Sequence, residues 1–130
     1  MKIFSVLALS CLIGGIAGCA LSDVTSPGNA LYPLTPGGDQ YFAIDWEPGE
    51  RKGAPVLTGT LTNRYGATAI RVQLLVEALD DNGNVTSQKV VWLGTDIAPF
   101  DRTYFEIPVV KSPKYRVRPF AFDWRGRAGP

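Results

Sequence analysis

Apolar residues recur at every second position through most of residues 39–124, a period typical of β-strands with one buried face. The clearest stretch is TAIRVQLLVEALD, residues 68–80. Its alternating apolar positions are Ile70, Val72, Leu74, Val76 and Ala78. No stretch beyond the first 18 residues has a convincing period of 3.6, so long helices are not expected there. The pattern therefore predicts an all-β domain.

An Asn-Gly pair follows this stretch at Asn82 and Gly83. Asn-Gly between two alternating runs is a strong signal for a β-hairpin, because a type I′ turn needs positive φ at both central residues. We therefore predict a tight turn here, with a return strand over residues 85–93.

The other alternating runs predict further short strands, and the pattern slips at Pro119, which indicates a bulge or a sheet edge there. Six or seven strands separated by turn signals point to a small antiparallel β-sandwich, with a barrel as the alternative. The residues expected to face the core of these strands are Phe42, Ile44, Trp46, Leu57, Gly59, Leu61, Phe105, Ile107, Tyr115, Val117, Phe120, Phe122 and Trp124.

The first 18 residues differ from the rest of the chain in their pattern. One Lys precedes an apolar run that is too short to span a membrane. The run ends in Ile16-Ala17-Gly18-Cys19, which resembles the lipobox of bacterial lipoprotein signal peptides. This resemblance implies cleavage between Gly18 and Cys19 and attachment of fatty acyl chains, palmitate among them, at Cys19. The alternative is that Cys19 is only a small residue of an ordinary cleavage site.

Residues 19–38 are rich in Pro and Gly and have no apolar period, which predicts a lipidated N-terminus and a flexible tether. An extended segment packed on the domain is the alternative, since Leu31 and Tyr32 could contact it. Residues 39–124 form the predicted sandwich domain, and residues 125–130 are expected to be a disordered tail.

Three stretches within residues 55–124 form a recognisable pattern: residues 59–63, the turn at residues 80–83, and residues 99–105. Through these stretches, residues 55–124 resemble the FxLYD family of immunoglobulin-like sandwiches in exported bacterial proteins. Val76, Ala78 and Leu79 replace the residues that give the family its name, and Phe100 stands where a glycine commonly follows the proline. The resemblance implies an immunoglobulin-like fold and an extracytoplasmic binding or structural module without catalytic residues.

Catalysis is not expected from the residues themselves. The chain has no histidine, and Cys19 is the only cysteine left after signal removal. Asp80, Asn82 and Gly83 match positions 3, 5 and 6 of a calcium loop, but Ala78 and Lys89 occupy positions 1 and 12, where essential ligands belong. We therefore expect no metal and no cofactor.

Charge is uneven along the chain although the net charge is only +1. A possible binding surface for an anionic partner of the envelope consists of Lys111, Lys114, Arg116 and Arg118. The alternative is that these residues offset the acidic stretch at residues 39–50, with Arg116 and Arg118 on the solvent side of a strand. A nucleic acid is not expected as the partner.

Three tryptophans, Trp46, Trp92 and Trp124, leave open a carbohydrate-binding face, although tryptophans in a small sandwich more often serve core and rim packing. Ala20 is not the aspartate that retains lipoproteins at the inner membrane in enteric-type sorting. The sequence therefore predicts a non-catalytic envelope lipoprotein on the periplasmic face of the outer membrane. Its expected partner, besides the membrane, is another envelope protein or polymer.

Overall fold

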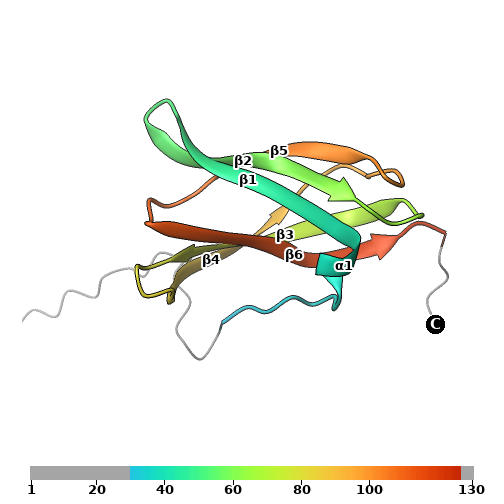
Figure 1. Cartoon of the computed structure of the whole chain (residues 1–130), viewed down its shortest axis with the longest axis horizontal. Helices are drawn as coiled ribbons and strands as arrows, with labels where there is room; N and C mark the ends of the chain where they lie inside the picture. The colour runs from blue at the N-terminus through green and yellow to red at the C-terminus, as the bar shows by residue number, and fades with distance from the viewer. Residues whose placement is uncertain (1–29, 127–130) are drawn as a thin grey trace, which may run out of the picture.

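The computed structural model describes residues 30–126 and contains six strands and one short helix. The strands form two antiparallel three-stranded sheets that stack on each other, with orders β1-β2-β5 and β4-β3-β6 (Figure 1). The predicted small all-β sandwich is therefore confirmed. The elements are α1 (Gly38–Tyr41), β1 (Phe42–Arg51), β2 (Ala54–Asn63), β3 (Ala69–Leu79), β4 (Val85–Trp92), β5 (Arg102–Pro108) and β6 (Lys114–Trp124).

The core lies between the sheets and is built from the alternating residues of each strand. Leu57 and Leu61 of β2 and Leu74 of β3 are fully buried, which matches their place on the apolar face of the period-two pattern. Both central strands, β2 and β3, are thus the most deeply buried, as expected for strands with a neighbour on each side. The core also contains Phe42, Val72, Val76, Phe105, Ile107 and Phe122.

The irregularity predicted at Pro119 is present, and β6 is also an edge strand. Gln73 of β3 lies opposite Ala121, but the next residue, Leu74, lies opposite Pro119, so Phe120 is an extra residue on β6. This bulge lets Val117 and Phe122 both reach the core despite their odd spacing.

The hairpin predicted between β3 and β4 is confirmed, but the two-residue type I′ turn is wrong. The loop spans residues 80–84, and of its central residues only Gly83 has positive φ, at 82°. The Gly83 N–H donates to the Asp80 carbonyl at 3.0 Å. The Asp80 carboxylate accepts the N–H groups of Asn82 and Asn84, both at 2.9 Å. These side-chain bonds stabilise a longer loop around a type I turn.

Gly83→Val is expected to lower the free energy of unfolding by about 1 kcal/mol or more, because a β-branched residue is strained at positive φ. Chemical denaturation should show this loss. Gly49→Val is a suitable control, since the Gly49 φ is not positive and no atom lies within 4 Å of a Cβ added there. An equal loss in both variants would show that the backbone angle at Gly83 is not the cause.

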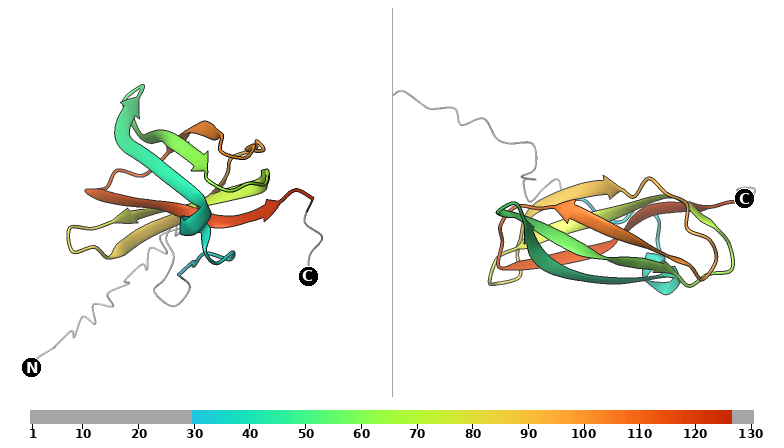
Figure 2. Two further views of the ribbon diagram at one scale, coloured as in Figure 1. Left: turned by 45° about the vertical axis from the view of Figure 1, so that its right-hand side comes forward. Right: turned by 90° about the horizontal axis from the view of Figure 1, so that it is seen from above.

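The described part of the predicted tether packs on the domain. Leu34 and Thr35 donate their N–H groups to the Phe120 carbonyl at 2.8 and 3.1 Å. This segment follows the outer side of β4-β3-β6, away from the other sheet (Figure 2). Residues 31–35 therefore pack on the domain as an extended segment, which was the alternative to a flexible tether. At the other end, the Arg125 N–H donates to the Thr68 carbonyl at 2.9 Å, so ordered contacts extend past Trp124.

Candidate functional site

Arg116 and Arg118 converge on one buried carboxylate, that of Glu77. The alternation of β6 puts both arginines on the outer side of β4-β3-β6, and the β3–β6 register brings them to Glu77. Arg116 Nε lies 2.8 Å from Glu77 Oε1, and Arg118 Nε lies 3.1 Å from the same oxygen. The Glu77 side chain is only 1% exposed. These two arginines therefore have a structural partner that the sequence pattern did not indicate.

Two opposing effects determine the pKa of Glu77. Burial raises it, but hydrogen bonds from Arg116 and Gln88 and the charges of Arg118 and Arg116 outweigh burial. The pKa of Glu77 is therefore lowered from its ordinary value of 4.5, and the carboxylate is charged at neutral pH. The same hydrogen bond raises the pKa of Arg116.

Gln88 joins this cluster to the N-terminal segment. Its side-chain amide donates to Glu77 Oε2 at 2.9 Å and to the Leu31 carbonyl at 3.0 Å. Its carbonyl oxygen accepts the Leu31 N–H at 2.8 Å. The cluster of Glu77, Gln88, Arg116 and Arg118 therefore holds residue 31 against β4, on the outer side of the sheet.

The predicted pairing of the C-terminal basic residues with the acidic stretch at residues 39–50 is not found among the ion pairs of the described residues. Arg116 and Arg118 contact Glu77, and Arg125 contacts Asp96. Strands β1 and β6 do lie near each other, but Arg116 and Arg118 point away from the sheet that contains β1. This orientation is the physical reason for the difference.

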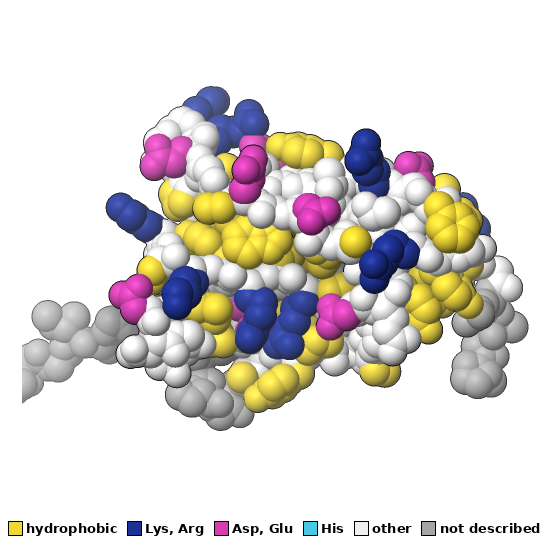
Figure 3. Space-filling view, viewed as in Figure 1, with side chains coloured by type: hydrophobic (Ala, Val, Ile, Leu, Met, Phe, Trp, Pro, Cys, Tyr) yellow, Lys and Arg dark blue, Asp and Glu magenta, His cyan; other side chains and the backbone are white. Residues whose placement is uncertain are grey.

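The two predicted lysines remain at the surface. Lys111 and Lys114 are exposed, and Lys114 Nζ donates to the Asp81 carbonyl at 3.3 Å. Figure 3 shows basic side chains along β6 with acidic ones beside them, and further basic side chains at the tip of the β1–β2 hairpin. Of the four predicted binding residues, Arg116 and Arg118 thus contact the buried Glu77 carboxylate, whereas Lys111 and Lys114 are exposed.

The three tryptophans lie in different surroundings. Trp46 packs edge-on to Tyr115 at 6.4 Å between ring centroids, whereas Trp124 stacks on Phe42 at 5.7 Å. Both pack against the core, while Trp92 on β4 is 61% exposed. Core and rim packing, the simpler of the two sequence interpretations, describes Trp46 and Trp124.

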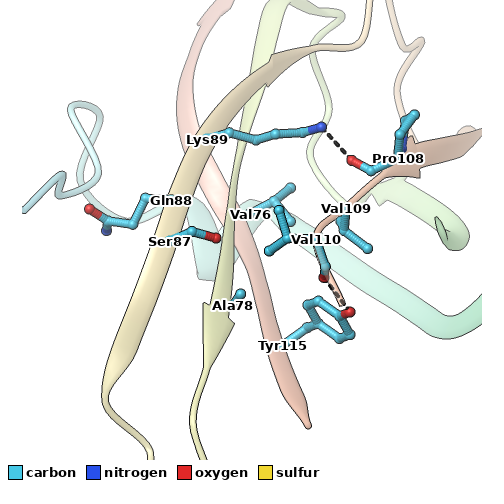
Figure 4. Close-up of a pocket in the computed structure, with 9 residues that line it drawn as sticks. All are labelled: Val76, Ala78, Ser87, Gln88, Lys89, Pro108, Val109, Val110 and Tyr115. Atoms are coloured by element: carbon cyan, nitrogen blue, oxygen red, sulfur yellow. Dashed lines mark hydrogen bonds between the residues drawn. The ribbon is translucent and has the colours of Figure 1, made fainter. Parts of the chain in front are cut away.

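An apolar groove opens where β4 faces the segment after β5 (Figure 4). It is lined mainly by Val76, Ala78, Val109, Val110 and Tyr115. The Tyr115 hydroxyl donates to the Val110 carbonyl at 2.6 Å, and Lys89 Nζ donates to the Pro108 carbonyl. These bonds fix two sides of the groove. No sequence pattern indicates this groove, because it depends on how the sheet edges meet.

In the candidate calcium loop, the Asp80 side chain binds backbone N–H groups of the loop itself. The Asp80 carboxylate is occupied by hydrogen bonds from Asn84 and Asn82, which also lower the pKa of Asp80. Within residues 30–126, no three carboxylate, histidine or cysteine side chains gather as a metal site requires. The one helix in this same part of the chain, α1, is too short to cross a membrane.

The predicted cleavage and lipidation residues, Gly18 and Cys19, lie outside the described residues. No protein-family model, curated protein or solved structure significantly matches this chain.

Proposed function

We propose that this chain is a bacterial lipoprotein whose sandwich domain is displayed from a membrane and acts by binding or assembly, without catalysis. The observation that carries the proposal is the Ile16-Ala17-Gly18-Cys19 sequence at the end of a short apolar run. Two or three acyl chains on Cys19 would give stable anchoring, since each buried CH₂ contributes about 0.8 kcal/mol.

The position of residue 31 defines how the domain would be displayed. Leu31 is held at Gln88 of β4, and twelve peptide units separate it from Cys19. Even fully extended, such a chain reaches only about 40 Å. The edge of the domain that contains β4 would therefore stay near the membrane, while the outer side of β1-β2-β5 would remain accessible to the surrounding envelope.

A binding or assembly role is supported by the exposed apolar side chains of the domain. Trp92, Phe100 and Tyr104 are each more than 60% exposed, and Val110 is about half exposed at the mouth of the groove. Large exposed aromatic residues are frequent anchors of protein interfaces. We place this display on the periplasmic face of the outer membrane because Ala20 lacks the charge of an inner-membrane retention residue.

Cys19→Ser is expected to abolish fatty acid attachment, because the serine hydroxyl does not replace the thiol that is alkylated. Cells fed an alkyne fatty acid should label the wild-type chain and leave the variant unlabelled. Cys11→Ser is the matched control and should retain the label, since Cys11 lies in the predicted signal peptide. Equal labelling of wild type and Cys19→Ser would contradict the proposal.

A further inference from the structure

Phe100 combines an unfavourable backbone angle with an exposed aromatic side chain. Its φ is 62°, in the left-handed region where glycine is favoured, and its side chain is 72% exposed. A phenylalanine in this position strains the backbone and recovers little of that cost by burial in its own domain. The side chain therefore suits a contact made outside the domain.

Asn63, which is 0% exposed, binds the loop that presents Phe100 from its buried side. The Asn63 side-chain amide donates to the carbonyls of Ala67, Ile97 and Ala98 at 2.8, 3.0 and 3.2 Å. In addition, the Asn63 N–H donates to the Asp101 carbonyl at 2.8 Å. Such preorganisation reduces the entropy lost when Phe100 is bound.

The groove has room for a phenyl ring and is lined mainly by apolar residues, with the polar side chains Ser87, Gln88 and Lys89 on its β4 side. Its volume is about 180 Å³. An apolar cavity of about 150 Å³ is enough to bind benzene. Figure 4 shows Val76, Ala78, Val109 and Val110 gathered around the groove, with Lys89 at one side.

We propose that Phe100 of one copy of this chain inserts into the groove of a second copy, so that the domains associate head to tail. Phe100 precedes β5 and the groove follows it, and the seven residues of β5 separate the two features by roughly 20 Å. One domain therefore cannot fill its own groove. A heterologous contact of this kind leaves a free Phe100 at one end and a free groove at the other, so it can propagate.

Charge also favours this pairing. Asp101 follows Phe100 directly and is exposed, as is Arg102 after it, and Lys89 lines the groove with its Nζ bonded to the Pro108 carbonyl. Insertion of the ring would bring this acidic residue of one copy towards the basic residue of the other. A rim pair of this kind aids orientation more than affinity.

The inference rests on the proposed membrane display, because burying one aromatic side chain gives weak association in solution. Copies anchored in the same membrane have an effective concentration in the millimolar range, at which weak contacts become populated. Self-association should therefore increase with the surface density of the lipidated chain.

Photocrosslinking of the full lipidated chain in liposomes tests the proposal. p-Benzoylphenylalanine is introduced in place of Phe100, where it keeps an aromatic ring, and in place of Tyr104 as a similarly exposed control. The label at residue 100 should give a ladder of dimers and larger species, at least fivefold above the control, with adducts mapped to the groove. Adducts only to lipid or to the second copy's residue 100 loop, or a yield equal to the control, would overturn the proposal.

Two variants separate assembly from folding and from anchoring. Val110→Asp in the groove mouth should remove the ladder, and fatty acid labelling in the same preparation shows whether Cys19 is lipidated. If the chain with the label at residue 100 and its natural Val110 is lipidated but gives no ladder, head-to-tail assembly alone is overturned. If that chain carries no fatty acid, the proposed membrane display is overturned. Phe100→Gly should raise the melting temperature by about 4 °C or more by relieving strain, and a lower melting temperature would overturn the premise that Phe100 is strained for a contact outside the domain.

Discussion

Gly59→Ala is expected to lower the free energy of unfolding by about 3 kcal/mol or more, near the upper end for an overpacked core position. A Cβ at residue 59 would lie 2.1 Å from the Asp45 carbonyl oxygen and 2.9 Å from the Phe105 ring. The first contact is with backbone in the paired strand β1, so it cannot be relieved by a side-chain rotation. The two central pairings of the β1-β2-β5 sheet, at Trp46 and Phe105, would have to separate.

Gly49→Ala is the matched control for this prediction. Gly49 lies in β1, its φ is not positive, and nothing lies within 4 Å of an added Cβ. Its replacement should change stability by no more than about 0.5 kcal/mol. Urea denaturation of both variants should therefore give widely separated midpoints. Similar midpoints would show that β1 and β5 can move away from β2 at Gly59 at little cost in stability.

The sequence predicted the strands well because one-sided burial leaves a visible period of two. Leu57, Gly59 and Leu61 alternate with threonines, and the structure puts the leucines in the core and Gly59 where two neighbouring strands approach closely. The break in the alternating pattern at Pro119 likewise corresponds to a bulge in β6. Periodicity carries this information because it depends only on which face of each strand is buried.

Features that depend on how distant segments meet could not be predicted in this way. Glu77 has the alternation of a solvent-facing residue, yet it is buried by the arginines of β6 and by Gln88. The Asn-Gly pair indicates the position of the turn at Gly83, but the type of this turn depends on side-chain bonds to Asp80. For the candidate site, the sequence indicated Arg116 and Arg118 without their partner, and it gave no sign of the groove.

Replacing both Arg116 and Arg118 with glutamine is expected to lower stability at neutral pH by about 3 kcal/mol, because it leaves the Glu77 carboxylate buried without an opposite charge. This is more than an exposed pair would contribute, since Glu77 is only 1% exposed although the arginines are partly solvated. Arg71→Gln is the control: Arg71 and Asp123 are both more than half exposed, so losing their pair should cost less than about 1 kcal/mol.

The same double variant should reverse how Glu77 makes stability depend on pH. In the wild type the folded-state pKa of Glu77 is lowered, so its stabilisation is present above about pH 4.5 and is lost as the pH falls through the folded-state pKa. Without the arginines, burial is expected to raise that pKa above 4.5. The folded state then favours protonated Glu77, and stability falls as the pH rises through the raised pKa.

Urea denaturation from pH 3 to pH 8 distinguishes these cases. The stability difference between wild type and the double variant should be small at pH 3 and should grow as the pH rises, because only the variant is penalised for ionising Glu77. Adding Glu77→Gln to the double variant should remove most of this growth, since no buried carboxyl group remains. A difference that stays constant over this range would mean that Arg116 and Arg118 stabilise the sheet by packing on it and not through their charge.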